Sequence, residues 1–211
     1  MRAVIVSGGK LEDIDLINRC MSEGSKLIAC DSGLNYIYRA KLKPDIILGD
    51  FDSVDDEVLD YYKKSGSEII TYPVKKDSTD TELGIFAAEK MGADDIIILA
   101  ASGTRLDHTI ANIQMLLPLL KKGTRARLID EHNIVELVND KLAINNKKGS
   151  YISFLPLTER VCGICSKGLE YPLNNTDIEV GTSLTVSNVV TSESAYVSVK
   201  SGVLISIIAR D

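Results

Sequence analysis

The segment "ILGDFDSVDDE", residues 47–57, places two carboxylates directly after a hydrophobic run. Residues 46–48 form a short apolar stretch that is typical of a buried strand. Asp50 and Asp52 then follow on either side of Phe51. Two such charges at the end of a core strand repel each other unless a proton is shared or a cation binds. The segment therefore indicates a core strand that ends in a polar site.

The first part of the chain alternates short hydrophobic runs with segments of helical periodicity. Continuous apolar strands between helices predict a mostly parallel sheet with helices on both faces. Pro118 lies inside the last helical segment and should kink or shorten that helix. The expected strands are 3–6, 27–29, 45–48, 68–71, 96–99 and 126–129, and the expected helices are 12–22, 34–41, 55–64, 80–91 and 106–121.

After about residue 131 the pattern changes to short segments rich in Val, Ile, Ser, Thr and Tyr. Several of them alternate apolar and polar residues, and turn signals separate them, which is typical of an antiparallel β-sandwich or half-barrel. We therefore expect an α/β domain in 1–131 and a β-sandwich domain in 132–211. The strands expected in the second domain are 133–138, 150–155, 184–188, 194–199 and 203–209.

The composition is that of a globular protein with a negative net charge. The 211 residues carry a net charge of −6, which argues against a nucleic-acid partner, because phosphate contacts need a basic face. No apolar run approaches the roughly 18 residues of a membrane span, and the N-terminus lacks a signal-peptide pattern. We therefore expect a cytoplasmic protein without a membrane partner and with reduced cysteines. Cys162 and Cys165 favour a strand over a metal or redox site, because no second pair accompanies them.

Polar residues collect where the predicted parallel strands end. Ligands of an open parallel sheet bind beyond the carboxyl ends of its strands. Each exit from the first five strands carries Gly, Ser, Lys or Asp; these exits are 7–10, 30–33, 49–53, 75–80 and 101–107. The Gly8-Gly9-Lys10 turn matches neither a Walker loop nor a dinucleotide fingerprint, so a tight turn explains it at least as well as a phosphate contact.

Helix capping is the alternative explanation for these polar residues. Possible caps are Asp31 or Ser32, Ser53 with Asp56, Thr79 with Glu82, and Thr104 with Asp107. Capping accounts for one acidic or hydroxyl residue per helix. It does not account for both Asp50 and Asp52, or for Asp77 ahead of a cap that Thr79 already fills.

A cluster of carboxylates at one sheet edge suits Mg²⁺, which is usually held by one or two carboxylates together with phosphate oxygens. Lys75, Lys76 and Arg105 are expected at the same edge, where they can meet phosphate oxygens that the metal leaves bare. Acidic residues, metal and basic residues together suggest phosphoryl or pyrophosphoryl transfer.

Four motifs in this order resemble those of the thiamine pyrophosphokinase family, of the bacterial type, over nearly the whole chain. They are Cys30-Asp31-Ser32-Gly33, Gly49-Asp50-Phe51-Asp52-Ser53, Lys76-Asp77-Ser78-Thr79-Asp80 and Gly103-Thr104-Arg105-Leu106-Asp107. The resemblance implies a homodimer, with its active site near the subunit interface, that uses ATP and Mg²⁺ to convert thiamine into thiamine diphosphate, releasing AMP.

The resemblance also implies roles for individual residues. Metal ligands would be Asp50, Asp52 and Asp80; catalytic residues would be Asp52, Asp77, Asp80, Arg105 and Asp107; residues that bind ATP or thiamine would be Asp31, Lys76, Thr79, Arg105, Tyr171, Ser187 and Asn188. The proton of the thiamine alcohol would pass to Asp77 or Asp80, and both remain open.

Two of these positions depart from the eukaryotic pattern of the family. Lys76 replaces a Gln that contacts thiamine, and Tyr171 replaces a Trp. A Tyr ring can still stack on a cationic thiazolium or a pyrimidine. A strand aromatic in the core of the sandwich explains Tyr171 equally well.

Two other functions use the same residues. A Mg²⁺-dependent phosphohydrolase would employ Asp50 as a covalent nucleophile, although its Asp-x-Asp pair normally follows the first strand and here follows the third. A non-catalytic nucleotide sensor would use the β domain to bind a partner, but it would not need so many acidic residues.

Overall fold

The computed structural model describes residues 1–74 and 77–210. The chain divides into two compact units, an N-terminal unit, Met1–Glu131, and a C-terminal unit, His132–Asp211.

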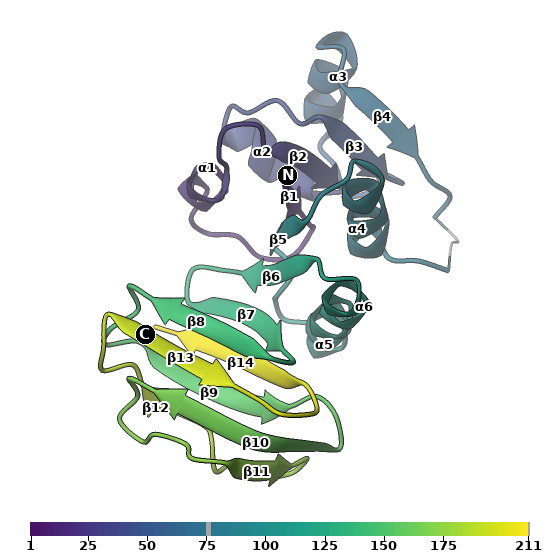
Figure 1. Ribbon diagram of the computed structural model, residues 1–211. Helices are drawn as coiled ribbons and strands as arrows, with labels where there is room; N and C mark the ends of the chain where they lie inside the picture. The colour runs from purple at the N-terminus through teal and green to yellow at the C-terminus, as the bar shows by residue number, and fades with distance from the viewer. Residues whose placement is uncertain (75–76, 211) are drawn as a thin grey trace. The chain divides into compact units, whose positions relative to one another are not determined.

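The N-terminal unit is built on a parallel sheet (Figure 1). Its strands pair in the order β6-β5-β1-β2-β3-β4, and each pair is parallel. The inner strands β1, β2, β3 and β5 are almost fully buried, as their uninterrupted apolar sequences predict. The strands are β1 (Arg2–Val6), β2 (Lys26–Cys30), β3 (Ile46–Gly49), β4 (Glu68–Thr71), β5 (Asp95–Leu99) and β6 (Arg125–Ile129).

The strand order reverses at β1. The chain runs outward from β1 through β2 and β3 to β4, and then returns to β5 and β6 on the other side of β1. Because parallel crossovers are right-handed, α1–α3 cover one face of the sheet and α4–α6 the other, and Figure 1 draws α4 opposite α2. The helices are α1 (Asp15–Cys20), α2 (Gly33–Arg39), α3 (Asp56–Lys64), α4 (Asp80–Lys90), α5 (Leu106–Gln114) and α6 (Leu116–Lys121).

The last predicted helix is divided, as Pro118 suggested. Helix α5 ends at Gln114 and α6 begins at Leu116, so Pro118 lies in the first turn of α6. A proline is tolerated there because the first N–H groups of a helix have no partner within that helix. No helix of the described residues is long and apolar enough to cross a membrane.

The C-terminal unit contains two groups of antiparallel strands. One group pairs in the order β12-β9-β14-β7 and the other in the order β11-β10-β13-β8. Both groups contribute to one apolar core, in which Phe154 and Val197 are fully buried. The strands are β7 (Asn133–Val138), β8 (Lys141–Asn145), β9 (Tyr151–Pro156), β10 (Arg160–Lys167), β11 (Thr176–Glu179), β12 (Asn188–Val189), β13 (Ser194–Ser198) and β14 (Leu204–Ala209).

The predicted fold class is confirmed: a parallel α/β sheet is followed by an antiparallel β-sandwich. The strand predicted at 184–188 is wrong, because residues 184–187 form turns and only Asn188 joins a strand. Strands β8 and β11 were not predicted. Both alternate exposed and less exposed residues and carry few large apolar side chains, so neither gives a strong sequence signal.

Gly84 lets α4 pack closely on the sheet. A Cβ atom at this position would lie 2.5 Å from Cys30 Sγ and 2.9 Å from Ile5 Cγ2. Ala usually stabilises a helix by about 1 kcal/mol relative to Gly. Here we expect Gly84→Ala to lower the free energy of unfolding by about 1–3 kcal/mol in urea titrations, because the core has no room for the methyl group.

The variant Gly84→Ala with Cys30→Ala is the matched control. Removing Cys30 Sγ takes away the nearest obstructing atom, so the double variant should be more stable than the sum of the single changes predicts. A Gly84→Ala protein as stable as the wild type would show that α4 does not need this close approach.

Candidate active site

The loop after β3 turns sharply and brings Asp50 and Asp52 to the same side. Gly49 has φ +152° and Phe51 has φ +66°, so the backbone on both sides of Asp50 is in conformations that L-residues rarely adopt. The N–H of Asp52 donates a hydrogen bond of 3.2 Å to Asp50 Oδ1. A side chain at Gly49 would lie 3.1 Å from the Cα of Asp31. The glycine therefore allows the loops after β2 and β3 to approach each other.

Asp31, directly after β2, faces this loop. Its φ is +47°, and its N–H donates a hydrogen bond of 2.8 Å to the Leu48 carbonyl. The Ser53 hydroxyl donates a hydrogen bond to Asp31 Oδ2. Asp31 Oδ1 is buried and has no hydrogen-bond partner among the described residues. A buried carboxylate oxygen without a donor is costly, so this atom favours a cation as its missing partner.

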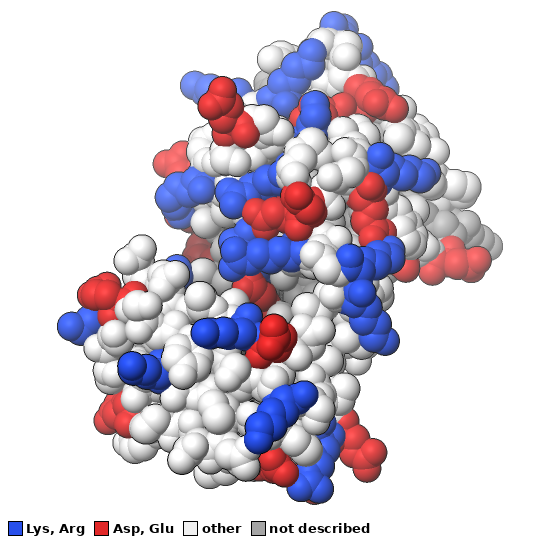
Figure 2. All heavy atoms as spheres, in the orientation of Figure 1, with Lys and Arg blue, Asp and Glu red and all other residues white. Residues whose placement is uncertain are grey.

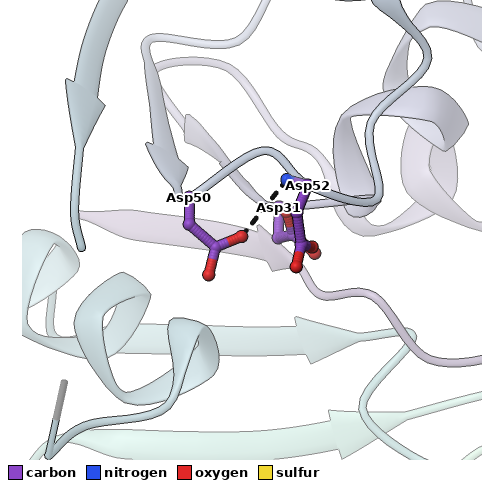
Figure 3. Close-up of side chains that lie close together, drawn as sticks. All are labelled: Asp31, Asp50 and Asp52. Carbon is purple, nitrogen blue, oxygen red and sulfur yellow. Dashed lines mark hydrogen bonds between the residues drawn. The ribbon is translucent and has the colours of Figure 1, made fainter. Parts of the chain in front are cut away.

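Asp31, Asp50 and Asp52 form the carboxylate cluster shown in Figure 3. Each offers one oxygen, and these oxygens lie within 4.8 Å of one another. The charge of Asp50 raises the pKa of Asp52, with smaller contributions from burial, Asp31 and Asp80. The raised pKa means that the full negative charge of the cluster is unfavourable without a cation.

The cluster is a local feature of these loops. On the face drawn in Figure 2, basic and acidic side chains are interspersed, without a large patch of one sign. In the part of the chain that the structure describes, the carboxylate cluster is the only group of three or more His, Cys, Asp or Glu side chains close enough to share a metal ion.

The loop before α4 carries further acidic residues. The Thr79 hydroxyl accepts a hydrogen bond of 3.2 Å from the Glu82 N–H, which confirms Thr79 as the helix cap. Asp80 is the first helical residue, and its charge contributes to the raised pKa of Asp52. Asp77 is exposed ahead of the cap. Lys76 lies outside the described residues.

Arg105 and Asp107 bind each other at the start of α5. The guanidinium Nη2 lies 2.6 Å from Asp107 Oδ2, and Nε donates a second hydrogen bond of 3.2 Å to Oδ1. These bonds, together with the His108 N–H, lower the pKa of Asp107 to about 2. Both side chains are largely exposed. The ion pair therefore contributes little to the free energy of unfolding. A phosphate group could replace the Asp107 carboxylate as the partner of Arg105.

The other possible caps do not form side-chain capping bonds. Ser53 binds Asp31 instead of capping α3, whose N-cap is Asp55 without a side-chain bond. Neither Ser32 at the start of α2 nor Thr104 near the start of α5 makes a capping bond. Among the described residues that the sequence offered as caps, Thr79 alone makes a side-chain capping hydrogen bond.

The Gly8-Gly9-Lys10 turn is tied to the loop after β5. The Gly9 N–H donates a hydrogen bond of 2.7 Å to the Ala100 carbonyl, and the Lys10 N–H donates one of 3.2 Å to the Ser102 carbonyl. A Cβ at Gly9 would lie 2.4 Å from the Ala100 oxygen. These two amides are thus used within the protein, which supports the tight turn over a phosphate loop.

Sequence reasoning missed two features of the site. The sequence placed Asp31 among the nucleotide-binding residues and not in one cluster with Asp50 and Asp52, and it offered Ser53 as a possible helix cap. The signal was present in the spacing, because Asp31 and Ser53 follow neighbouring parallel strands and such ends meet at one sheet edge.

In the C-terminal unit, Tyr171 and Asn188 are joined by their polar atoms. Asn188 Nδ2 donates a hydrogen bond of 2.7 Å to the Tyr171 carbonyl, and the Tyr171 N–H donates one of 3.0 Å to Asn188 Oδ1. Asn188 is buried, whereas Tyr171 is 65% exposed and belongs to no strand. The interpretation of Tyr171 as a core aromatic is therefore wrong. Ser187 is exposed with φ +57°, and its N–H donates a hydrogen bond to Ser153 Oγ.

Comparison with known proteins identifies the family. The family description "Thiamin pyrophosphokinase, catalytic domain" matches residues 17–128, and "Thiamin pyrophosphokinase, vitamin B1 binding domain" matches residues 134–204. A thiamine pyrophosphokinase of Bacillus subtilis (strain 168) is 32% identical over 211 residues, which cover 98% of each chain.

Solved structures agree with this match over the whole chain. A crystal structure of thiamine pyrophosphokinase from Bacillus subtilis has a TM-score of 0.92 at 29% identity and covers 100% of both chains. That of thiamin pyrophosphokinase from Geobacillus thermodenitrificans has a TM-score of 0.88 at 26% identity and covers 100% of this chain and 98% of the other. The chain therefore belongs to the thiamine pyrophosphokinase family of enzymes.

Proposed function

We propose that this enzyme transfers pyrophosphate from ATP to the hydroxyethyl oxygen of thiamine in a Mg²⁺-dependent reaction, giving thiamine diphosphate and AMP. The observation that carries the proposal is the carboxylate cluster, in which Asp31 Oδ1 is buried and has no hydrogen-bond partner among the described residues. The membership of the chain in this family supports the same function. The alternatives, a phosphohydrolase and a nucleotide sensor, have no comparable support.

The chemistry is an in-line displacement at the β-phosphorus of ATP. The thiamine alcohol oxygen forms a bond to this phosphorus, and the bond from the phosphorus to the oxygen bridging the α- and β-phosphates breaks. AMP leaves with that oxygen, and the alcohol proton passes to a carboxylate of the enzyme. Positioning and charge neutralisation account for most of the catalysis in such transfers.

The residues fit a divalent cation. Carboxylate oxygens are the ligands that Mg²⁺ prefers, and Asp31, Asp50 and Asp52 would hold it. When bound, Mg²⁺ neutralises the charge of phosphate oxygens during the transfer. The protein holds these oxygens close together before any ligand binds, through the backbone turns at Asp31 and Phe51. This set adds Asp31 to the ligands that the sequence suggested, whereas Asp80 contributes its charge from the neighbouring helix.

Other residues at the sheet edge take the remaining roles. Arg105 contacts the transferring phosphates, and Asp107, ionised at neutral pH because its pKa is about 2, orients the guanidinium. Thr79 fixes the start of α4 and with it the place of Asp80. Asp77 and Asp80 are the two candidates for the base that accepts the alcohol proton.

We assign nucleotide binding and catalysis to 1–131 and thiamine binding and dimerisation to 132–211. The match to a catalytic domain supports catalysis in the N-terminal unit, and the match to a vitamin B1 binding domain supports thiamine binding in the C-terminal unit. Tyr171, Ser187 and Asn188 belong to the thiamine side. We also infer a homodimer with its active site near the subunit interface, in the cytoplasm, where the four free cysteines would remain reduced.

The direct test is to incubate the protein with ATP, Mg²⁺ and thiamine and to quantify AMP and thiamine diphosphate. We expect equal amounts of both products and none when EDTA replaces Mg²⁺. In Asp52→Asn we expect kcat/KM to fall by about 100-fold or more, because the cluster loses one of its charges. Asp56→Asn is the matched control, since Asp56 is an exposed acid on α3 outside the cluster.

The fold should survive this change. Asp52 is exposed, and its charge is unfavourable in the free protein, so Asp52→Asn should unfold at the same temperature as the wild type or higher. Near-normal turnover by a purified Asp52→Asn protein would refute the metal role. Release of free phosphate from ATP, without thiamine diphosphate, would instead favour a phosphohydrolase.

The Arg105–Asp107 pair gives a separate prediction. Asp107→Asn removes the carboxylate that orients the Arg105 guanidinium, so we expect kcat/KM to fall about 10- to 100-fold. Stability should change by no more than about 0.5 kcal/mol, because the pair is exposed. If Asp107→Asn had the same kcat/KM as the wild type in the AMP assay, Asp107 would have no catalytic role and would serve only as an acidic residue in the first turn of α5.

A further inference from the structure

Asn188 is buried in the C-terminal unit, and its side chain is occupied by main-chain groups. Only 6% of the residue is exposed. Its Oδ1 accepts hydrogen bonds from the N–H groups of Tyr171, at 3.0 Å, and Val189, at 2.9 Å, and its Nδ2 donates to the Tyr171 carbonyl at 2.7 Å. The amide therefore binds both polar groups of the Tyr171 backbone and is poorly placed to contact a substrate directly.

The position of Asn188 is itself fixed by β9. Asn188 pairs with Ile152, and the preceding Ser187 N–H donates a hydrogen bond of 3.0 Å to Ser153 Oγ. Thr185 is tied to Phe154, whose N–H donates a hydrogen bond of 3.0 Å to the Thr185 carbonyl. Asn188 thus links the segment around Tyr171, residues 170–173 (the Tyr171 segment), to strand β9 of the sandwich.

The Tyr171 segment is held on both sides of its aromatic residue. The Glu170 N–H donates a hydrogen bond of 2.9 Å to the Val189 carbonyl. Two residues beyond Tyr171, the Leu173 N–H donates one of 2.8 Å to Ser166 Oγ. Pro172 further restricts the backbone of Tyr171 to extended conformations.

The Tyr171 ring, in contrast, is presented to solvent. The residue is 65% exposed, and none of the described residues hydrogen-bonds its hydroxyl or stacks on its ring. An aromatic side chain that is exposed on a backbone fixed at this many points resembles a binding surface more than a packing element. Such a ring offers a π face to a flat or cationic heteroaromatic ligand.

We propose that Asn188 is a positioning residue, which acts on thiamine through Tyr171 and not by contact with the substrate. This inference rests on the proposed function, because it takes thiamine as the ligand of the Tyr171 ring. It changes the role implied by the family resemblance, in which Asn188 was a binding residue in its own right. The fixed backbone pre-orders the ring, so that less conformational freedom is lost when thiamine binds.

The test is a double-variant cycle with Asn188→Ala and Tyr171→Ala, using calorimetric titration of thiamine and steady-state kinetics. We expect each single variant to raise the Kd and KM for thiamine about tenfold or more, and to leave the KM for ATP unchanged. The double variant should be no worse than Tyr171→Ala alone, because Asn188 has no effect without the ring it positions. Asn139→Ala, an exposed Asn in the turn between β7 and β8, is the control.

Asn188→Asp tests the same point if Asn188→Ala fails to fold. It keeps the shape and the Oδ1 acceptor but replaces the donor to the Tyr171 carbonyl by a carboxylate oxygen, so thiamine binding should weaken and exchange of the Tyr171 amide proton should become faster. The proposal would be overturned if the increases in the Kd for thiamine of the two single variants multiplied in the double variant. It would also be overturned if the KM for thiamine were unchanged in Asn188→Ala and Asn188→Asp. Wild-type protein that does not bind thiamine at all would instead refute the proposed function, and this inference with it.

Discussion

The repulsion among Asp31, Asp50 and Asp52 is the constraint on which the account of this enzyme depends. The protein holds three carboxylate oxygens within 4.8 Å of one another, although like charges at this separation are unfavourable. Left-handed backbone at Asp31 and Phe51 keeps them there. A non-glycine residue in such a conformation is itself unfavourable, and strain of this kind is concentrated at functional sites. The close carboxylates and the strained backbone together favour a positively charged partner at this place.

The parallel sheet explains how residues distant in sequence reach one place. Asp31 follows β2 and Asp50 follows β3, and these strands are neighbours in the sheet. Gly49 allows the two loops to approach, and Ser53 joins them by its bond to Asp31. This part of the site could be predicted from sequence, because continuous apolar runs locate the strands. The carboxyl ends of neighbouring parallel strands lie at the same edge of the sheet, where ligands bind.

Other parts depend on contacts that no local pattern reveals. The hydroxyl of Ser53 has the spacing of a helix cap, and only the fold shows that Asp31 is its partner. The segment 184–188 has strand-forming residues, but Thr185 and Ser187 are drawn into turns by bonds to β9. The backbone of Tyr171 is likewise bound by Asn188, which lies 17 residues away along the chain.

Cation binding by the carboxylate cluster can be tested directly by following the Asp carboxyl carbons by NMR as a function of pH, without and with Mg²⁺. In the free protein, the charge of Asp50 is the main cause that raises the pKa of Asp52. Protonated Asp52 therefore contributes to the stability of the fold at pH values below the pKa that Asp52 has in the unfolded chain. This contribution is lost as pH rises through the pKa that Asp52 has in the folded protein. We predict an elevated Asp52 pKa in the free protein that falls when Mg²⁺ is added. An ordinary pKa that does not respond to Mg²⁺ would contradict the account.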